Sequence, residues 1–165
     1  DEAARYDRRI LVEWAVPCAR EIEVSVLGNE EPIASVPGEV VPKRVFYDYV
    51  AKYLAEGEDI SELRIPAPLE TKETQKIQSL AVDAYIAIDG AGMARVDFLI
   101  NGKTDAIYLN EINTIPGFTS ISMYPKLWEA SGIPYAQLLD RLIDLALDRH
   151  KENEKSERVF RPINE

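Results

Sequence analysis

The feature that most constrains the fold is a pair of apolar segments, residues 93–100 and 106–112, joined by a short polar connection. The connection, Asn101-Gly102-Lys103-Thr104-Asp105, has the turn chemistry of a hairpin, so the two segments are predicted to pair as antiparallel strands. Residues 21–27 alternate apolar and polar side chains with the period of a strand that has one wet face. Together these segments predict an antiparallel sheet.

Helical periodicity accompanies these strand patterns. Residues 71–89 are predicted to form an amphipathic helix, with Thr71 as N-cap and Gly90 as the stop. Ser122 is predicted to cap a short helix, and residues 135–150 form a further amphipathic helix. An antiparallel sheet flanked by helices is an α+β fold. The predicted inward positions are Ile77, Leu80, Ala81, Ala84, Tyr85 and Ile88 in the first helix, and Leu138, Leu139, Leu142, Ile143 and Ala146 in the last.

Other segments have weaker signals. Asp1 to Arg8 is interpreted as the end of a helix, Ile10 to Val12 as a short strand ending at Glu13, and residues 33–36 as a returning strand. Residues 39–70 are irregular and contain a run of aromatic residues. Such a run is typical either of a functional loop or of a surface connection that packs its own tyrosines.

Composition narrows the classes of function. The 165 residues include 19 Lys and Arg against 29 Asp and Glu, an acidic balance that argues against a duplex nucleic-acid partner. No apolar run approaches the roughly 20 residues of a membrane span, and no signal segment is expected at the start. The lone Cys18 fits a reducing compartment, and with the single His150 it excludes Cys-based zinc and multi-His metal sites. Any metal must be held by carboxylates and amides, which indicates a hard cation such as Mg²⁺.

The predicted hairpin has polar residues on one face. Arg95 and Asp97 lie two apart and share a face, as do Glu111 and Asn113. A loop centred near Thr104 places Asp97 opposite Glu111, where two carboxylates repel each other by up to about 1 kcal/mol. A cation bound between the two carboxylates would turn this repulsion into a net attraction. The alternative is a solvent-exposed strand face on which Arg95 pairs with Asp97 or Glu111.

The segment that follows the second strand is small, polar and contains glycine. Its residues are Asn113-Thr114-Ile115-Pro116-Gly117-Phe118-Thr119-Ser120. Their backbone N–H groups could bind an oxyanion, and Ser122 at a helix start adds a hydroxyl and a dipole that favours a carboxylate. An ordinary loop explains each residue singly, but it explains less well the order of metal face, anion loop and helix start.

Three ordered motifs resemble those of a known family. Arg95-Val96-Asp97-Phe98, followed by the run from Asn110 to Thr119, is similar to the signature of D-alanine–D-alanine ligases of the ATP-grasp superfamily. The run from Phe46 to Tyr53 resembles that family's omega loop, and Arg20-Glu21-Ile22-Glu23-Val24 also fits. The resemblance covers about residues 1–150 and implies an ATP-grasp C-terminal domain with part of the central domain.

The sequence departs from the family pattern in two places. Val50 stands where the omega loop usually has an acidic residue, and Trp14 to Ala19 is about one residue longer than usual. The resemblance also divides the chain. It implies the remainder of the central subdomain at 1–40, the omega loop and connection at 41–70, the C-terminal domain at 71–150 and a charged tail at 151–165.

The family implies an enzymatic activity. An ATP-dependent ligase would join two D-alanines through a D-alanyl phosphate for peptidoglycan synthesis, with ATP as co-substrate and two Mg²⁺ or Mn²⁺ ions per site. It would be cytoplasmic, homodimeric at full length, and without nucleic-acid or membrane partners.

The alternatives are a D-alanine–D-lactate or D-alanine–D-serine ligase, another ATP-grasp carboxylate–amine ligase, and a non-catalytic ATP-grasp-like domain. Lys52-Tyr53 favours the dipeptide. The chain is interpreted as a C-terminal fragment, inactive alone, because an ATP-grasp site binds nucleotide between two lobes.

The resemblance also implies residue roles. Arg95 and the Gly117 N–H would form an oxyanion hole, Lys52 would approach the γ-phosphate, and Tyr53 would close over the second substrate. By kind of contact, the implied residues are Asp97, Glu111 and Asn113 for the metals; Arg95, Gly117 and Tyr53 for catalysis; Ser122, Met123 and Lys52 for the substrate; and Glu13, Glu21, Phe46, Lys52 and Asn110 for ATP.

Overall fold

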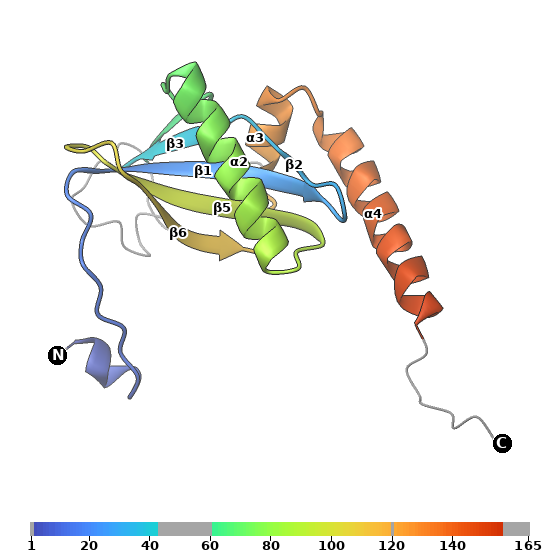
Figure 1. Cartoon of the computed structure of the whole chain (residues 1–165), viewed down its shortest axis with the longest axis horizontal. Coiled ribbons are helices and arrows are strands. Elements are labelled where there is room, and N and C mark those ends of the chain that lie inside the picture. The colour runs from blue at the N-terminus through green and yellow to red at the C-terminus, as the bar shows by residue number, and fades with distance from the viewer. Residues whose placement is uncertain (1, 43–60, 120, 157–165) are drawn as a thin grey trace.

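The computed structural model describes residues 2–42, 61–119 and 121–156. Over these residues the chain forms one antiparallel sheet with helices on both faces, so the predicted α+β class is confirmed. Figure 1 shows helix α2 lying across one face of the sheet, with α3 and α4 on the other side. The strands are β1 (Ala19–Gly28), β2 (Ile33–Ala34), β3 (Gly38–Val41), β4 (Glu62–Arg64), β5 (Gly92–Asn101) and β6 (Ile107–Asn113), in the spatial order β4-β3-β1-β5-β6 with β2 paired to β1.

The sheet is built around the long pair β1 and β5. Their register runs from Ala19 opposite Asn101 to Gly28 opposite Gly92. Successive side chains of a strand point to opposite faces, so Ile22, Val24 and Val26 turn to one side while Glu21, Glu23 and Ser25 turn to the other. The two faces therefore differ in chemistry before any helix is added.

Helix α2 (Thr71–Ala87) covers the apolar face. Its Ile77, Ala81 and Tyr85 are buried against the even-numbered residues of β1 and β5, and the Tyr85 hydroxyl donates to the Gly28 carbonyl at 2.8 Å. Two expectations were wrong. Glu70, not Thr71, is the N-cap, and Leu80 and Ile88 are 37% and 47% exposed because the stripe that packs on the sheet is narrower than the apolar pattern.

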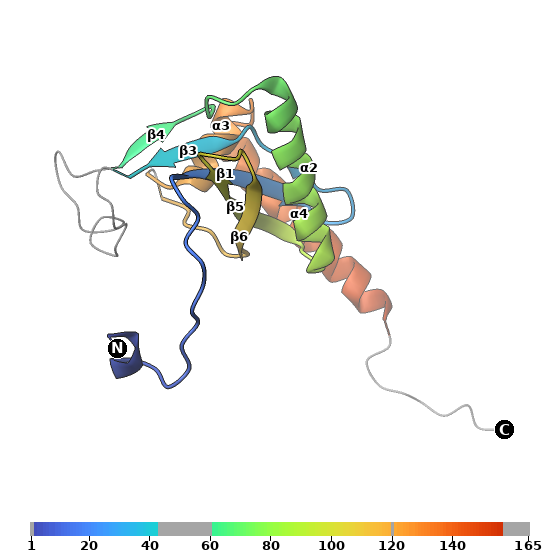
Figure 2. The ribbon, with the colours of Figure 1, turned by 60° about the vertical axis from the view of Figure 1, so that its left-hand side comes forward.

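Helices α3 (Met123–Ala130) and α4 (Tyr135–Lys155) lie on the opposite side (Figure 2). Ser122 is the N-cap of α3, as predicted, and Gly132 follows its end. Helix α3 approaches the sheet closely at Gly38, where an added Cβ would lie 2.5 Å from Met123 Cε. In α4, Leu138 is fully buried and Leu142 and Leu145 pack against the same cluster, but the predicted inward residues Leu139 and Ile143 are 39% and 60% exposed because they lie beside that packed stripe.

The start of the chain differs from expectation. Only Ala3–Arg5 is helical, as a short 3-10 turn labelled η1, and residues 10–12 form no strand. They belong to an extended, exposed segment that leads away from the sheet at the start of β1 (Figure 1). The predicted strand at 33–36 is confined to β2, whereas β3 and β4 lie partly within the region expected to be irregular. Among the described residues, no helix is both long and apolar enough to span a bilayer.

Candidate active site

A row of acidic side chains crosses three neighbouring strands on the face opposite α2. The register places Glu23 of β1 opposite Asp97 of β5, and Asp97 opposite Glu111 of β6. Opposed residues of an antiparallel pair share a face, so the three carboxylates point to the same side. The prediction that Asp97 lies opposite Glu111 is confirmed. We call these three residues the carboxylate row.

Arg95 bridges the two inner carboxylates. Its Nε donates to Asp97 Oδ1 at 2.8 Å and its Nη2 donates to Asp97 Oδ2 at 2.7 Å. The same Nε lies 3.1 Å from Glu23 Oε2. The three side chains are only 12–13% exposed, so these contacts are shielded from water. This pairing is the one that the alternative reading of the strand face anticipated, and it is built on the same residues as the candidate metal site.

The electrostatics of the carboxylate row are asymmetric. Burial alone would lower the pKa of Arg95, but the hydrogen bond to Asp97 and the charges of Glu23, Asp97 and Glu111 together raise that pKa above its ordinary value. Arg95 is therefore a permanent cation here. One guanidinium facing three carboxylates leaves an excess of negative charge, which favours a further cation.

Strand β6 has an irregularity beside the carboxylate row. Asp97 pairs with Glu111 while the next residue, Phe98, pairs with Leu109, so Asn110 is an additional residue in β6. Bulges of this kind commonly reorient side chains next to functional sites. Asn110 lines a small cavity of about 70 Å³ together with Glu21, Glu23 and Glu111. It also lines a larger neighbouring cavity of about 650 Å³.

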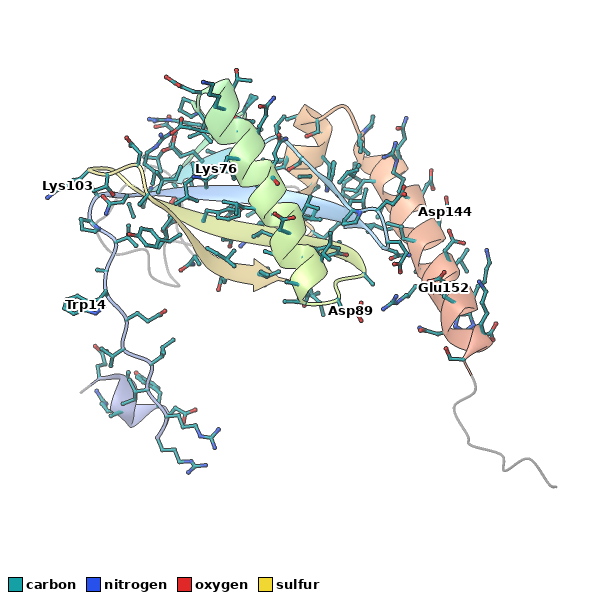
Figure 3. The ribbon with its side chains drawn as sticks, in the orientation of Figure 1. Trp14, Lys76, Asp89, Lys103, Asp144 and Glu152 are labelled. Atoms are coloured by element: carbon teal, nitrogen blue, oxygen red, sulfur yellow. The ribbon has the colours of Figure 1, made fainter. Side chains whose placement is uncertain are left out.

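The larger cavity lies between the sheet and the segment that precedes β1. Glu13 and Pro17 line it from that segment, and Leu99 and Tyr108 line it from β5 and β6. Figure 3 shows Trp14 on this segment, pointing away from the sheet, and the Trp14 side chain is fully exposed. The structure thus places Glu13, Glu21 and Asn110 around two adjoining cavities on one face.

The loop after β6 brings Gly117 against Ser122. The Thr119 N–H donates to Ser122 Oγ at 3.0 Å, and the Thr119 and Ser122 hydroxyl oxygens lie 2.8 Å apart. A Cβ on Gly117 would lie 2.9 Å from Ser122 Oγ, which is too close for a real contact. Glycine is therefore needed there for the Ser122 hydroxyl to occupy its position.

The start of α3 lies close to the carboxylate row. Gly38, beneath the Met123 side chain, is the register partner of Glu23. Ser25, the register partner of Arg95, donates its hydroxyl to the Tyr124 carbonyl at 3.2 Å. Met123 is 6% exposed and its side chain packs in the core, so the side chain is not available to a substrate.

The donor set fits a hard divalent cation. Asp97, Glu111 and Asn113 lie on one face and contribute only oxygen ligands, which suits Mg²⁺ or Mn²⁺. Within the described parts of the chain, no group of three or more His, Cys, Asp or Glu side chains forms a ready metal site. That finding agrees with the structure, since Arg95 holds both oxygens of Asp97.

The sequence did not predict one residue of the site, and some of the residues that it did predict lie outside the part of the chain that the structure describes. Glu23 was interpreted only as part of a strand motif, although the period-2 pattern of residues 21–27 already put it on the polar face with Glu21. The predicted omega-loop residues Phe46, Lys52 and Tyr53 lie outside the described residues.

Comparisons with known proteins identify the family of the chain. The family model described as D-ala D-ala ligase C-terminus matches residues 1–144. The chain is 56% identical over 156 residues to a D-alanine–D-alanine ligase of Heliobacterium modesticaldum, covering 94% of this chain and 42% of the relative. It is 57% identical over 150 residues to the D-alanine–D-alanine ligase of Clostridium acetobutylicum, covering 91% of this chain and 43% of that one.

Solved structures show the same similarity. The D-alanine–D-alanine ligase of Coxiella burnetii superposes with a TM-score of 0.79 at 45% identity, over 93% of this chain and 39% of that chain. The VanG D-Ala:D-Ser ligase of Enterococcus faecalis superposes with a TM-score of 0.66 at 36% identity, over 78% of this chain and 36% of that chain. The chain thus spans about two fifths of the length of these relatives.

Proposed function

Because the chain belongs to the D-ala D-ala ligase C-terminus family, we propose that it contributes the cation-binding and oxyanion-binding part of an ATP-dependent D-alanine–D-alanine ligase. The observation that carries this proposal is the convergence of the carboxylate row, Arg95 and the Gly117–Ser122 loop on one face of the sheet. A purely structural polar face does not require a glycine that makes room for a serine hydroxyl.

The reaction has two steps. The carboxylate of one D-alanine attacks the γ-phosphorus of ATP, which releases ADP and leaves a D-alanyl phosphate. The amine of a second D-alanine then attacks the acyl carbon, and collapse of the tetrahedral intermediate expels phosphate and gives the dipeptide. Divalent cations, held by Asp97, Glu111 and Asn113, would neutralise the phosphate oxygens.

The residues of this chain have distinct tasks in that scheme. The Arg95 guanidinium and the Gly117 N–H donate hydrogen bonds to the oxyanion of the tetrahedral intermediate, an effect commonly worth about 3–4 kcal/mol per donor. The Ser122 hydroxyl and the Met123 backbone N–H, at the start of α3, bind the carboxylate of the second D-alanine.

Nucleotide contacts are assigned to the two adjoining cavities. Glu13 and Asn110 would contact adenine, and Glu21 would contact the ribose hydroxyls. The omega-loop residues would complete the site, with Phe46 lining the adenine pocket, Lys52 near the γ-phosphate and Tyr53 over the second substrate.

We propose D-alanine as the second substrate. Relatives of 52–57% identity are named D-alanine–D-alanine ligases, whereas the D-Ala:D-Ser ligase neighbour is 36% identical. We further propose that the working enzyme is a cytoplasmic homodimer with no nucleic-acid or membrane partner. The isolated 165-residue chain is expected to be inactive, and the four-part division at residues 40, 70 and 150 is retained as a prediction.

A chimera tests the proposal. This chain replaces the matching segment of the Heliobacterium modesticaldum ligase, and phosphate release and dipeptide formation are measured with D-alanine, D-serine or D-lactate as second substrate. We expect ATP-dependent D-alanyl-D-alanine synthesis that is lost in the Asp97→Asn variant. A folded chimera without activity, or one that prefers D-serine or D-lactate, contradicts the proposal. Dipeptide synthesis by the isolated chain contradicts its expected inactivity.

A further inference from the structure

Glu23 has no role in the scheme above, yet it lies at the centre of the site. It is in the middle of β1, opposite Asp97 on one side and opposite Gly38 on the other. Its side chain is 12% exposed. A buried carboxylate is costly unless it is paired, so its presence beside two further acidic residues requires a physical reason.

The contacts of Arg95 supply that reason. Asp97 accepts from both Nε and Nη2, at 2.8 Å and 2.7 Å, while Glu23 Oε2 lies 3.1 Å from the same Nε. Asp97 is thus the main acceptor in this state. Glu23 is already within reach of the guanidinium as a second acceptor.

The proposed function makes Asp97 serve two partners. Its two oxygens hold Arg95 in this structure, and the same oxygens would coordinate a divalent cation. A guanidinium and a cation compete for one carboxylate, because both attract the same lone pairs and repel each other. When the cation binds, Arg95 must give up part of its pairing with Asp97 and needs another acceptor on the same face.

We propose that Glu23 is a positioning residue that holds the Arg95 guanidinium on the site face when Asp97 coordinates a divalent cation. The inference rests on the proposed function only in taking Asp97 as a cation ligand. Glu23 suits this task because it is on a central strand, is buried, and already contacts the guanidinium. Outer carboxylates that orient the groups around a metal site act in this way.

Two other roles for Glu23 make different predictions. A purely structural glutamate would stabilise the fold without affecting how Arg95 responds to a cation. A direct cation ligand would contribute to cation affinity whether or not Arg95 is present. The proposed role requires that the effect of Glu23 on cation binding depend on Arg95.

The side-chain Nε–H resonance of Arg95 provides a direct readout in the 165-residue chain. In the wild type, MgCl₂ is expected to shift this resonance while the Nε–H stays protected from exchange with water, and the carboxyl carbon of Glu23 is expected to shift with it. In Glu23→Gln, the same titration is expected to increase Nε–H exchange at least about tenfold, because the ion pair is absent. An Arg95 or Glu23 resonance that does not respond to MgCl₂ in the wild type overturns the inference without any variant.

Glu39→Gln is the matched control. Glu39 is a buried glutamate, 5% exposed, that pairs with Arg20 on the α2 face. Its replacement is expected to lower stability and leave the response of Arg95 to MgCl₂ unchanged. If Glu39→Gln and Glu23→Gln alter the Arg95 response equally, Glu23 has a structural role only and the inference is overturned.

A double-mutant cycle with Mn²⁺ alone separates the remaining alternative. Glu23→Gln is expected to weaken Mn²⁺ binding, measured by electron paramagnetic resonance, about tenfold. In the Arg95→Gln background the same change is expected to cost less than about twofold, because Arg95 no longer competes. An equal loss in both backgrounds makes Glu23 a ligand and overturns the inference.

The two proposals can fail separately. An inactive chimera whose chain still shows the Arg95 response refutes the ligase activity, while an active chimera without that response refutes the role of Glu23.

Discussion

Two buried glutamates of one sheet have different charge environments. On the α2 face, Glu39 lies 2.6 Å from Arg20 and 3.7 Å from Arg64, and Arg64 also binds Glu62 at 2.8 Å, so two arginines face two carboxylates. On the site face the charges do not balance, since the single Arg95 is shared by Glu23 and Asp97 and lies next to Glu111. The first cluster neutralises its carboxylate within the protein. The second cluster has a net negative charge, which favours the binding of a divalent cation.

Removing the shared cation is expected to have the largest effect. Arg95→Met takes away the partner of two buried carboxylates, so the free energy of unfolding at pH 7 is expected to fall by about 3–5 kcal/mol. Because a divalent cation can replace the lost charge, MgCl₂ should recover part of this loss. Urea unfolding with and without MgCl₂ measures both quantities, and a loss below about 1 kcal/mol contradicts the charge imbalance.

A substitution in the α2-face cluster is expected to lower the free energy of unfolding less. Glu39→Gln removes the negative charge that pairs with Arg20, whose side chain is 34% exposed and also donates to the Pro68 carbonyl. The guanidinium therefore keeps a partner and contact with water, and the expected loss is about 1.5–3 kcal/mol. MgCl₂ should recover none of it. Recovery by MgCl₂ equal to that of Arg95→Met would show that the two faces do not differ.

Gly117→Ala is expected to separate chemistry from stability on the site face. Its Cβ would meet Ser122 Oγ at 2.9 Å and displace that hydroxyl. Because Gly117 is exposed, the unfolding free energy should change by less than about 1 kcal/mol. Misplacement of a binding group commonly costs about 100-fold in rate, so dipeptide synthesis by the chimera should fall by about that factor. An unchanged rate would place the oxyanion and substrate contacts elsewhere.

The smallest expected effect is that of Tyr85→Phe, on the α2 face, on how the unfolding free energy changes at alkaline pH. Burial raises the pKa of Tyr85 to about 12, with the charge of Arg149 acting weakly in the opposite sense. The unfolded tyrosine ionises near pH 10, so this contribution is complete below pH 10 and is lost as the pH rises toward about 12. Tyr85→Phe should make the decline of the unfolding free energy over that interval less steep. Urea unfolding between pH 9 and 11 measures the slope, and identical slopes contradict the assignment.

The sequence predicted those parts of the site that lie close together along the chain. The short turn after Asn101 determined the register of β5 and β6, so Asp97 and Glu111 were placed opposite each other correctly. Ser122 was recognised because N-cap chemistry is local. Glu23 was missed because its pairing with Asp97 depends on which distant strand lies beside β5, and no local pattern encodes that choice.

Prediction from local sequence has the same limit for the buried faces of the helices. The periodicity of residues 71–89 and 135–150 predicted both helices, but not which apolar positions find a partner. Leu80 and Ile143 remain exposed because the surface that each helix meets is narrower than its apolar stripe. The additional residue Asn110 in β6 was also not predicted, since a bulge depends on how two strands pair and not on one strand alone.

The position of a bound cation tests the central claim most directly. Crystals of the chain grown with MnCl₂ and ATP would locate Mn²⁺ by its anomalous scattering. We expect a peak on the site face, within about 2.0–2.5 Å of oxygens of Asp97 and Glu111, with Arg95 turned toward Glu23. A fully occupied Mn²⁺ site elsewhere, with Arg95 still holding both oxygens of Asp97, would contradict the account.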